Sequence, residues 1–422
     1  MNTPLFAFLT FILIASSSVF ANSFNAGERH KHTSNVLNEQ REVQILLPES
    51  YGFDTNTSYP VIYLLDGEYN FHGVSGMLDL MANKGQLIPD VILVAISDKG
   101  TDKYRQYMTP NDLTAPRKPG DKGKASEFQQ YLQTELKPFI EKNYRTADTS
   151  VLVGHSIGGL FVLNALLERP NSFTHYVATS PSLWLNDHAF VKKAAPLLAK
   201  AKHEKVNLYL ALGDETRMGQ YRFIDVLDDL QPGSIQWQFK HYPDENHNSV
   251  GLIALRGALK SMFSGWFVPE TKLNQLSDPD TLIEHYARLK QEFGIHQPIP
   301  TPSMRAAIRY FYRNDKVIEL ESFLTKVSQK VPASESGFIM MAASYAGHFD
   351  SPQSALNLML EKSERYKNSV EYVKAIAGIY EKLSNSKRAN VYYRSALELA
   401  QKQNANQWQI NIINAKIAAT NS

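Results

Sequence analysis

Short apolar runs alternate with longer amphipathic stretches between about residues 30 and 265, and this alternation limits the possible folds more than any other feature of the chain. The runs at 61–65 and 91–96 are apolar on both faces, as expected for strands covered by helices on both sides. Helix-period stretches such as 128–140 separate the runs. The pattern predicts an α/β fold with a mainly parallel sheet flanked by helices. The strand-like runs are 42–47, 61–65, 91–96, 150–153, 176–179, 206–212 and 235–241.

Beyond Trp266 the strand signal disappears, and the 422-residue length leaves room for a second domain. Residues 269–280 are polar and are predicted to be a linker, and residues 281–422 are predicted to form an all-α domain. A helical-repeat domain is expected there, with an ordinary helical bundle packed on the first domain as the alternative. A spacing that resembles the tetratricopeptide repeat joins Tyr380, Ala389, Tyr393 and Ala396.

The amino terminus carries an apolar run from Leu5 to Ala15, which is too short for the ~20 residues of a membrane span. Small residues follow as far as Ala21, as before a cleavage site. We therefore expect residues 1–21 to be a signal peptide and residues 22–268 to form the first domain of a periplasmic or secreted protein. An uncleaved anchor is the alternative. No later segment approaches 18 apolar residues, so no membrane span is expected after cleavage.

Composition excludes several kinds of site and partner. The chain has no cysteine, which rules out disulfides, thiolate metal sites, a cysteine nucleophile and a lipoprotein anchor. Lys and Arg total 44 against 42 for Asp and Glu, so nothing in the charge predicts a nucleic-acid partner. Apolar residues make up 43% of the chain, which is enough for a sizeable core.

A Gly-x-Ser-x-Gly motif at 154–158 lies between a predicted strand and a predicted helix, the context of a nucleophile elbow. The sharp turn strains the serine backbone and leaves no room for flanking side chains. Ser156 is the predicted nucleophile. The N–H of Ile157, at the start of the helix, is a predicted donor to an oxyanion. The alternative is a glycine-rich turn without function.

Such a serine needs a base and an acid that orients the base. His247 follows the last predicted strand and is the best candidate, whereas His155 and His241 are expected to be structural. The loop after the penultimate strand offers Asp214 and Glu215, of which we favour Glu215. The order serine, acid, histidine is that of the α/β-hydrolase fold.

The second oxyanion donor is expected in the loop after 61–65. Gly67 permits a close approach of the backbone there, so the N–H of Glu68 or Tyr69 is the predicted donor. A plain tight turn is the alternative. A wall that binds an aromatic or anionic acyl group through stacking and cation–π contacts is predicted near the elbow. Its candidate residues, with core packing as the alternative for the tryptophan, are Phe71, Tyr104, Arg105 and Trp184.

Together these motifs resemble the esterase D-like putative esterases of the α/β-hydrolase superfamily, above all the branch with the enterobactin- and salmochelin-trilactone esterases. The likeness spans residues 61–250 and does not cover 270–422. It implies an ester hydrolase that needs no metal or cofactor. The family often has an arginine shortly before an Asp-Leu-Thr-Pro-like run, and here Arg105, Thr109 and Pro110 are kept but the acidic residue of that run is not. The matching segments are 64–67, 154–159, 180–184 and 247–250.

The leading hypothesis is therefore an exported serine carboxylesterase that acts on siderophore-type or other small acyl esters through an acyl-enzyme. Acylated carbohydrates, such as feruloyl or acetyl esters, are the alternative substrate class. A non-catalytic protein that binds a partner through the helical tail is the alternative from another class, and the intact Ser156 and His247 argue against it. The tail also remains a candidate for binding a protein partner or a second copy of the chain.

Overall fold

The computed structural model describes residues 27–52, 57–98, 100–115, 121–200, 205–403, 405 and 407–420. The predicted signal peptide, residues 1–21, lies outside the described residues. Within the described ranges, no helix combines the length and the apolar character that crossing a membrane requires.

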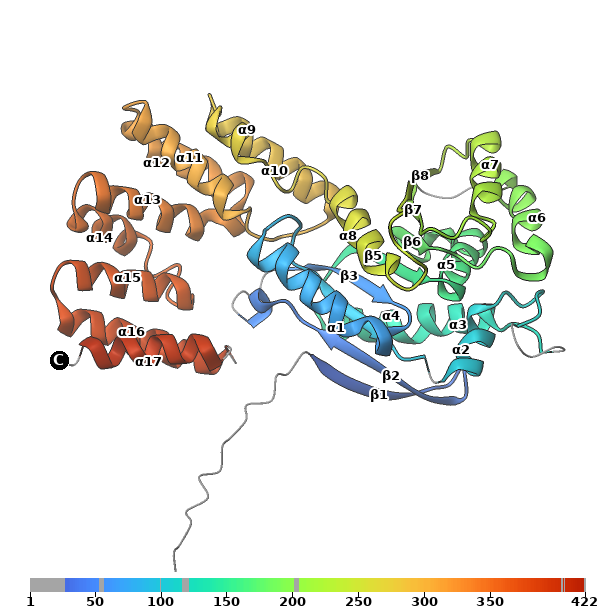
Figure 1. Ribbon diagram of the computed structural model, residues 1–422. Coiled ribbons are helices and arrows are strands. Elements are labelled where there is room, and N and C mark those ends of the chain that lie inside the picture. Colours follow the sequence, from blue (N-terminus) through green and yellow to red (C-terminus); the bar gives the residue numbers. More distant parts are fainter. Residues whose placement is uncertain are drawn as a thin grey trace, which may run out of the picture.

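An eight-stranded sheet lies at the centre of the first part of the chain, with the strand order β1-β2-β4-β3-β5-β6-β7-β8 (Figure 1). Strands β3 to β8 run parallel to one another, and β1 and β2 add an antiparallel edge. The predicted mainly parallel sheet is therefore confirmed. The strands are β1 (Glu28–Ser34), β2 (Glu39–Leu46), β3 (Tyr59–Leu64), β4 (Ile92–Ile96), β5 (Thr146–His155), β6 (His175–Thr179), β7 (Val206–Leu212) and β8 (Ile235–His241).

Helices cover both faces of the sheet, which explains why its inner strands are apolar on both sides. One core cluster joins alternate strand residues to α2, α3, α5, α6 and α7, and the other joins the remaining strand residues to α1 and α8. The bounds of these helices, with α4 between α3 and α5, are α1 (Gly67–Leu78), α2 (Thr101–Met108), α3 (Ala125–Tyr131), α4 (Lys137–Asn143), α5 (Ile157–Glu168), α6 (Leu185–Lys200), α7 (Gln220–Leu230) and α8 (Val250–Met262).

The segment from 100 to 124 begins with helix α2. Tyr104, Tyr107 and Met108 are buried on one face of α2, at the i, i+3, i+4 spacing that a helix places together. The charged residues between them hid this short stripe in the sequence.

The segment from 269 to 280, predicted as a linker, contains the short helix α9 with a buried Leu273. The next helix, α10, packs directly on the sheet: the Phe293 and Phe263 rings are 5.2 Å apart, and the Thr149 hydroxyl donates to the Phe293 carbonyl at 2.7 Å. The second core cluster accordingly continues from the sheet into α10, α11, α12 and α13. The first helices of the tail thus share a core with the sheet. The alternative to a separate helical-repeat domain, a helical bundle packed on the first domain, also expects such a shared core.

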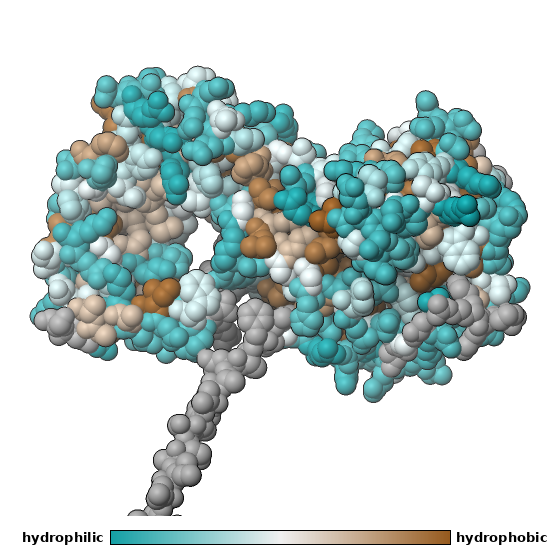
Figure 2. All heavy atoms as spheres, viewed as in Figure 1, coloured by the Kyte–Doolittle hydropathy of each residue, from teal (hydrophilic) through white to brown (hydrophobic). Residues whose placement is uncertain are grey.

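Beyond these helices the tail extends away from the sheet as a curved stack (Figure 1). Consecutive helices pack in pairs, with Ala377 of α15 and Ala389, Tyr393 and Ala396 of α16 buried in one cluster. Hydrophilic residues cover most of the face seen in Figure 2, with smaller hydrophobic areas between the two parts. The tail helices are α9 (Glu270–Asn274), α10 (Pro279–Phe293), α11 (Thr301–Arg313), α12 (Leu320–Lys330), α13 (Glu335–Phe349), α14 (Pro352–Glu361), α15 (Val370–Lys382), α16 (Ser386–Lys402) and α17 (Gln407–Thr420).

Candidate active site

Ser156 lies in the turn between β5 and α5, near the middle of the sheet. Its backbone has φ 55° and ψ −118°, a strained conformation for a residue with a side chain. Gly154 is required beside it, because a Cβ there would lie 2.4 Å from the Gly158 carbonyl oxygen. The turn therefore has the geometry of a nucleophile elbow and holds the hydroxyl at the carboxyl edge of the parallel strands.

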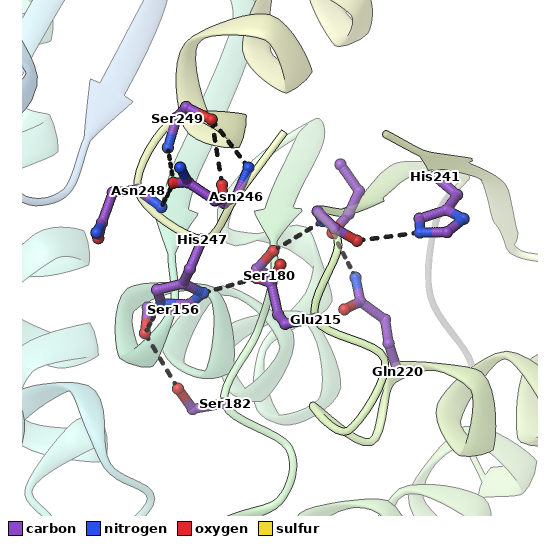
Figure 3. A network of polar contacts seen from close by, with 12 residues as sticks. Ser156, Ser180, Ser182, Glu215, Gln220, His241, Asn246, His247, Asn248 and Ser249 are labelled. Atoms are coloured by element: carbon purple, nitrogen blue, oxygen red, sulfur yellow. Dashed lines mark hydrogen bonds and ion pairs between the residues drawn. The ribbon is translucent and has the colours of Figure 1, made fainter. Parts of the chain in front are cut away.

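A continuous chain of hydrogen bonds joins three residues that follow three different strands (Figure 3). Ser156 Oγ lies 3.0 Å from His247 Nε2, and His247 Nδ1 lies 2.7 Å from Glu215 Oε1. These contacts fit a neutral imidazole that donates from Nδ1 to the carboxylate and accepts the serine proton at Nε2. This is the arrangement in which a histidine can deprotonate a serine.

Glu215, rather than Asp214, is the carboxylate in contact with the histidine. Asp214 is exposed, and its backbone N–H donates to the Glu245 carbonyl at 2.8 Å. The Glu215 side chain instead folds back over Gly213, where a Cβ would lie 2.5 Å from Oε2. Glycine at 213 is thus a condition for placing this carboxylate.

Hydrogen bonds also decide the charge of Glu215. Burial alone would raise the pKa of this carboxyl, but hydrogen bonds from Ser180 and His247 outweigh burial and lower its pKa below the usual value. The carboxylate is therefore ionised at neutral pH, ready to stabilise a proton on the imidazole.

The two histidines expected to be structural contact the candidate site: His155 packs on His247, and His241 binds the turn before Glu215. His155 lies with its ring centroid 4.5 Å from that of His247, and burial, reinforced by His247, lowers the pKa of His155 to about 4. It is therefore neutral at pH 7 and adds no charge beside the catalytic candidate. His241 Nε2 donates to the Gly213 carbonyl at 3.0 Å and so holds the turn that leads to Glu215.

Two backbone amides are candidates for an oxyanion hole. Ile157 is the first residue of α5, so its N–H has no carbonyl partner in the preceding turn of the helix. Glu68 is the second residue of α1, which begins so close to β4 that a Cβ on Gly67 would lie 2.6 Å from the Ile96 nitrogen. The Tyr69 N–H donates to the Asp66 carbonyl at 3.1 Å, which leaves Glu68 as the better second donor.

The prediction that four residues form a substrate-binding wall is wrong for Phe71 and Tyr104. Phe71 is 4% exposed on the sheet side of α1, and Tyr104 is 8% exposed, with its hydroxyl against Gly158. Both are core residues, because their helices turn these positions inward. Trp184 is 47% exposed in the loop after β6, and Arg105 is partly exposed on α2, so these two remain candidates.

Several polar residues that the sequence analysis did not assign complete the site. Ser182 Oγ lies 3.3 Å from Ser156 Oγ. Ser180 accepts the Gly213 N–H at 3.3 Å, and Gln220 donates to the Ala211 carbonyl at 2.6 Å (Figure 3). The Ser180 contact joins the ends of β6 and β7, and the Gln220 contact joins the first residue of α7 to β7. Only the sequence likeness around 180–184 pointed to this loop.

One further carboxyl group lies beside the elbow. Asp66 precedes α1 with a left-handed φ of 54°, and burial raises the pKa of Asp66 to about 7. A Cβ on Gly158 would lie 3.4 Å from Asp66 Oδ2, so this group borders the first turn of α5. Within the part of the chain that the structure describes, no three histidine or carboxylate side chains are arranged to hold a metal ion.

Known proteins share both the sequence pattern and this fold. The model of the family described as putative esterase matches residues 34–248. The ferri-bacillibactin esterase BesA of Bacillus subtilis is 27% identical over 264 residues, which cover 57% of this chain and 91% of BesA.

Two solved structures extend the comparison. An IroE-like serine hydrolase from Shewanella oneidensis is 27% identical, with a TM-score of 0.59, over 74% of this chain and 99% of its own. An uncharacterised protein from Capnocytophaga ochracea is 17% identical, with a TM-score of 0.54, over 93% of this chain and 99% of its own. The second likeness concerns the fold alone, and it extends over most of the tail.

Proposed function

The chain belongs to the putative esterase family and is a carboxylic ester hydrolase, and from that premise we propose that it acts through Ser156, His247 and Glu215. The observation that carries this proposal is the unbroken chain of hydrogen bonds, 3.0 Å from Ser156 to His247 and 2.7 Å from His247 to Glu215.

In the proposed reaction, Ser156 Oγ attacks the ester carbonyl carbon while its proton moves to His247 Nε2. Glu215 stabilises the imidazolium that forms. The amides of Ile157 and Glu68 donate to the negative oxygen of the tetrahedral intermediate. When the intermediate collapses, the alcohol leaves with the proton from His247, and an acyl group remains on Ser156. Water, deprotonated by the same histidine, then releases the acid.

For the substrate class, we propose siderophore-type esters. BesA is named a ferri-bacillibactin esterase, two other relatives are named siderophore esterases, and 27% identity over 91% of the length of BesA supports a related substrate for this chain. Trp184 and Arg105 fit such a substrate, because an exposed indole stacks on an aromatic acyl group and a guanidinium attracts an anionic one. Feruloyl and acetyl esters of carbohydrates are the alternative substrates that the experiment has to exclude.

We also propose that residues 1–21 direct export and that 22–268 and 281–422 are the two parts of the mature protein. A periplasmic or culture-medium product whose amino-terminal residue is Asn22 is the expected result. An exported product that keeps residues 1–21 would contradict the cleavage proposal.

The test of function is a substrate panel on purified protein, with Ser156→Ala as the matched control. We expect wild-type protein to hydrolyse siderophore trilactones faster than acylated xylan fragments, and the variant to hydrolyse neither. Equal activity of Ser156→Ala would refute the mechanism. Faster hydrolysis of the xylan esters would refute only the substrate class.

A further inference from the structure

Ser182 brings a second hydroxyl to the proposed nucleophile. Its Oγ lies 3.3 Å from Ser156 Oγ, and the residue is 5% exposed. Figure 3 shows Ser182 and the His247 imidazole on different sides of the Ser156 hydroxyl. Ser182 takes no part in the proposed steps at Ser156, His247 and Glu215.

The backbone fixes Ser182 against the elbow. Its N–H donates to the Ser156 carbonyl at 3.0 Å, and the Ser156 N–H donates to the Thr179 carbonyl, also at 3.0 Å. The loop presses so closely on α5 that a Cβ on Gly159 would lie 3.1 Å from Pro181 Cα. The distance between the two hydroxyls is therefore set by the fold before any substrate binds.

The hydrogen-bonding capacity of Ser156 shows what the second hydroxyl can do. In the neutral-imidazole arrangement described above, Ser156 Oγ donates its one proton to His247 Nε2 and keeps two lone pairs. The Ser182 hydroxyl can donate to one of those lone pairs while the other faces the substrate. Such a bond fixes the direction of the remaining lone pair and so holds Ser156 Oγ in position for attack.

We propose that Ser182 is a positioning residue whose hydroxyl donates to Ser156 Oγ and holds it toward His247 with one lone pair free to face the substrate. This inference rests on the proposed function. The Ser156 proton passes to His247 Nε2 as the bond from Oγ to the carbonyl carbon forms, and Ser182 keeps its own proton throughout. In the acyl-enzyme, Ser156 Oγ is an ester oxygen and a weaker acceptor, so the bond contributes most in the attack step.

The test is the rate at which a fluorophosphonate probe labels Ser156, because labelling requires attack but no later step. We expect Ser182→Ala to lower this rate about 10-fold. For p-nitrophenyl acetate, kcat/KM should fall by a similar factor while KM stays within about 2-fold. Ser182→Thr keeps the hydroxyl and should label faster than Ser182→Ala.

Ser303→Ala is the matched control. Ser303 lies in α11, is 1% exposed, and pairs its hydroxyl with that of Tyr286 at 2.8 Å. The control thus removes a comparable buried hydroxyl far from the elbow, and it should lower the melting temperature without changing the labelling rate. If Ser182→Ala does not fold, Ser182→Cys replaces it, because a thiol is a weak donor of similar size.

Labelling of Ser182→Ala within about 2-fold of wild type, or no advantage of Ser182→Thr over Ser182→Ala, would overturn the inference and leave the proposed function intact. Failure of the probe to label wild-type protein at Ser156 would instead overturn the proposed function itself.

Discussion

The substitution Glu215→Gln tests the electrostatic part of the proposed mechanism. It keeps the size of the side chain and an oxygen near His247, but it removes the negative charge that lies 2.7 Å from Nδ1. The wild-type carboxylate is ionised at neutral pH, since its hydrogen bonds lower its pKa below the usual value. The substitution therefore removes a charge that is present throughout the working pH range.

The expected loss follows from the distance and the exposure of the pair. Two unit charges whose centres are about 4 Å apart interact by about 4 kcal/mol at an effective dielectric constant of about 20. The His247 side chain is 36% exposed and that of Glu215 is 19% exposed, so solvent screens part of this energy. We take about 3 kcal/mol, which corresponds to a loss of about 100-fold in kcat/KM.

The assay is hydrolysis of p-nitrophenyl acetate at pH 8, with Asp214→Asn as the matched control. Asp214 is the adjacent acid and is exposed, so its substitution should leave kcat/KM within about 2-fold of wild type. The reasoning fails if Asp214→Asn loses most of the activity, or if Glu215→Gln keeps more than about a third of it.

Three further predictions concern stability. Gly159→Ala should lower the free energy of unfolding in urea by about 1–3 kcal/mol, because the new Cβ would lie 3.1 Å from Pro181 Cα. An unchanged urea concentration at the midpoint of unfolding would contradict this tight packing. Burial lowers the pKa of His155 and of His175 to about 4, below the 6.5 of the unfolded chain. As the pH falls, the unfolded state therefore binds protons before the folded state does, and the stability present above pH 6.5 should be lost progressively toward pH 4. His175→Gln should reduce the dependence of the melting temperature on pH between pH 7 and 4. An unchanged dependence in this variant would contradict the prediction. A fragment of residues 27–268 should have a lower melting temperature than the full chain, or aggregate, because it lacks the α10 residues that complete the second core cluster. An equal melting temperature would instead favour independent domains.

The inner parallel strands could be predicted from the sequence because burial on both faces leaves an apolar run. Strand β1 could not, since Glu28–Ser34 is a mostly polar segment at the antiparallel edge of the sheet. The same reason hid α2, whose buried face is only Tyr104, Tyr107 and Met108 among charged neighbours.

For the candidate site, chain order was enough to select the loops that the fold brings together, although it left both Asp214 and Glu215 as candidate acids. Ser156, Glu215 and His247 each follow a parallel strand, and the carboxyl ends of such strands meet at one edge. Residues that face the site from a helix were harder to predict. Phe71 was expected to line the substrate pocket and points into the core instead, because a motif does not show the rotation of its helix.

The proposed mechanism requires that Ser156 becomes acylated, and mass spectrometry of the protein trapped by acid after mixing with p-nitrophenyl acetate tests this step most directly. We expect one acetyl group on the peptide that carries Ser156, which disappears on longer incubation and is absent from Ser156→Ala. Wild-type turnover without an adduct, together with full activity of Ser156→Ala, would contradict it.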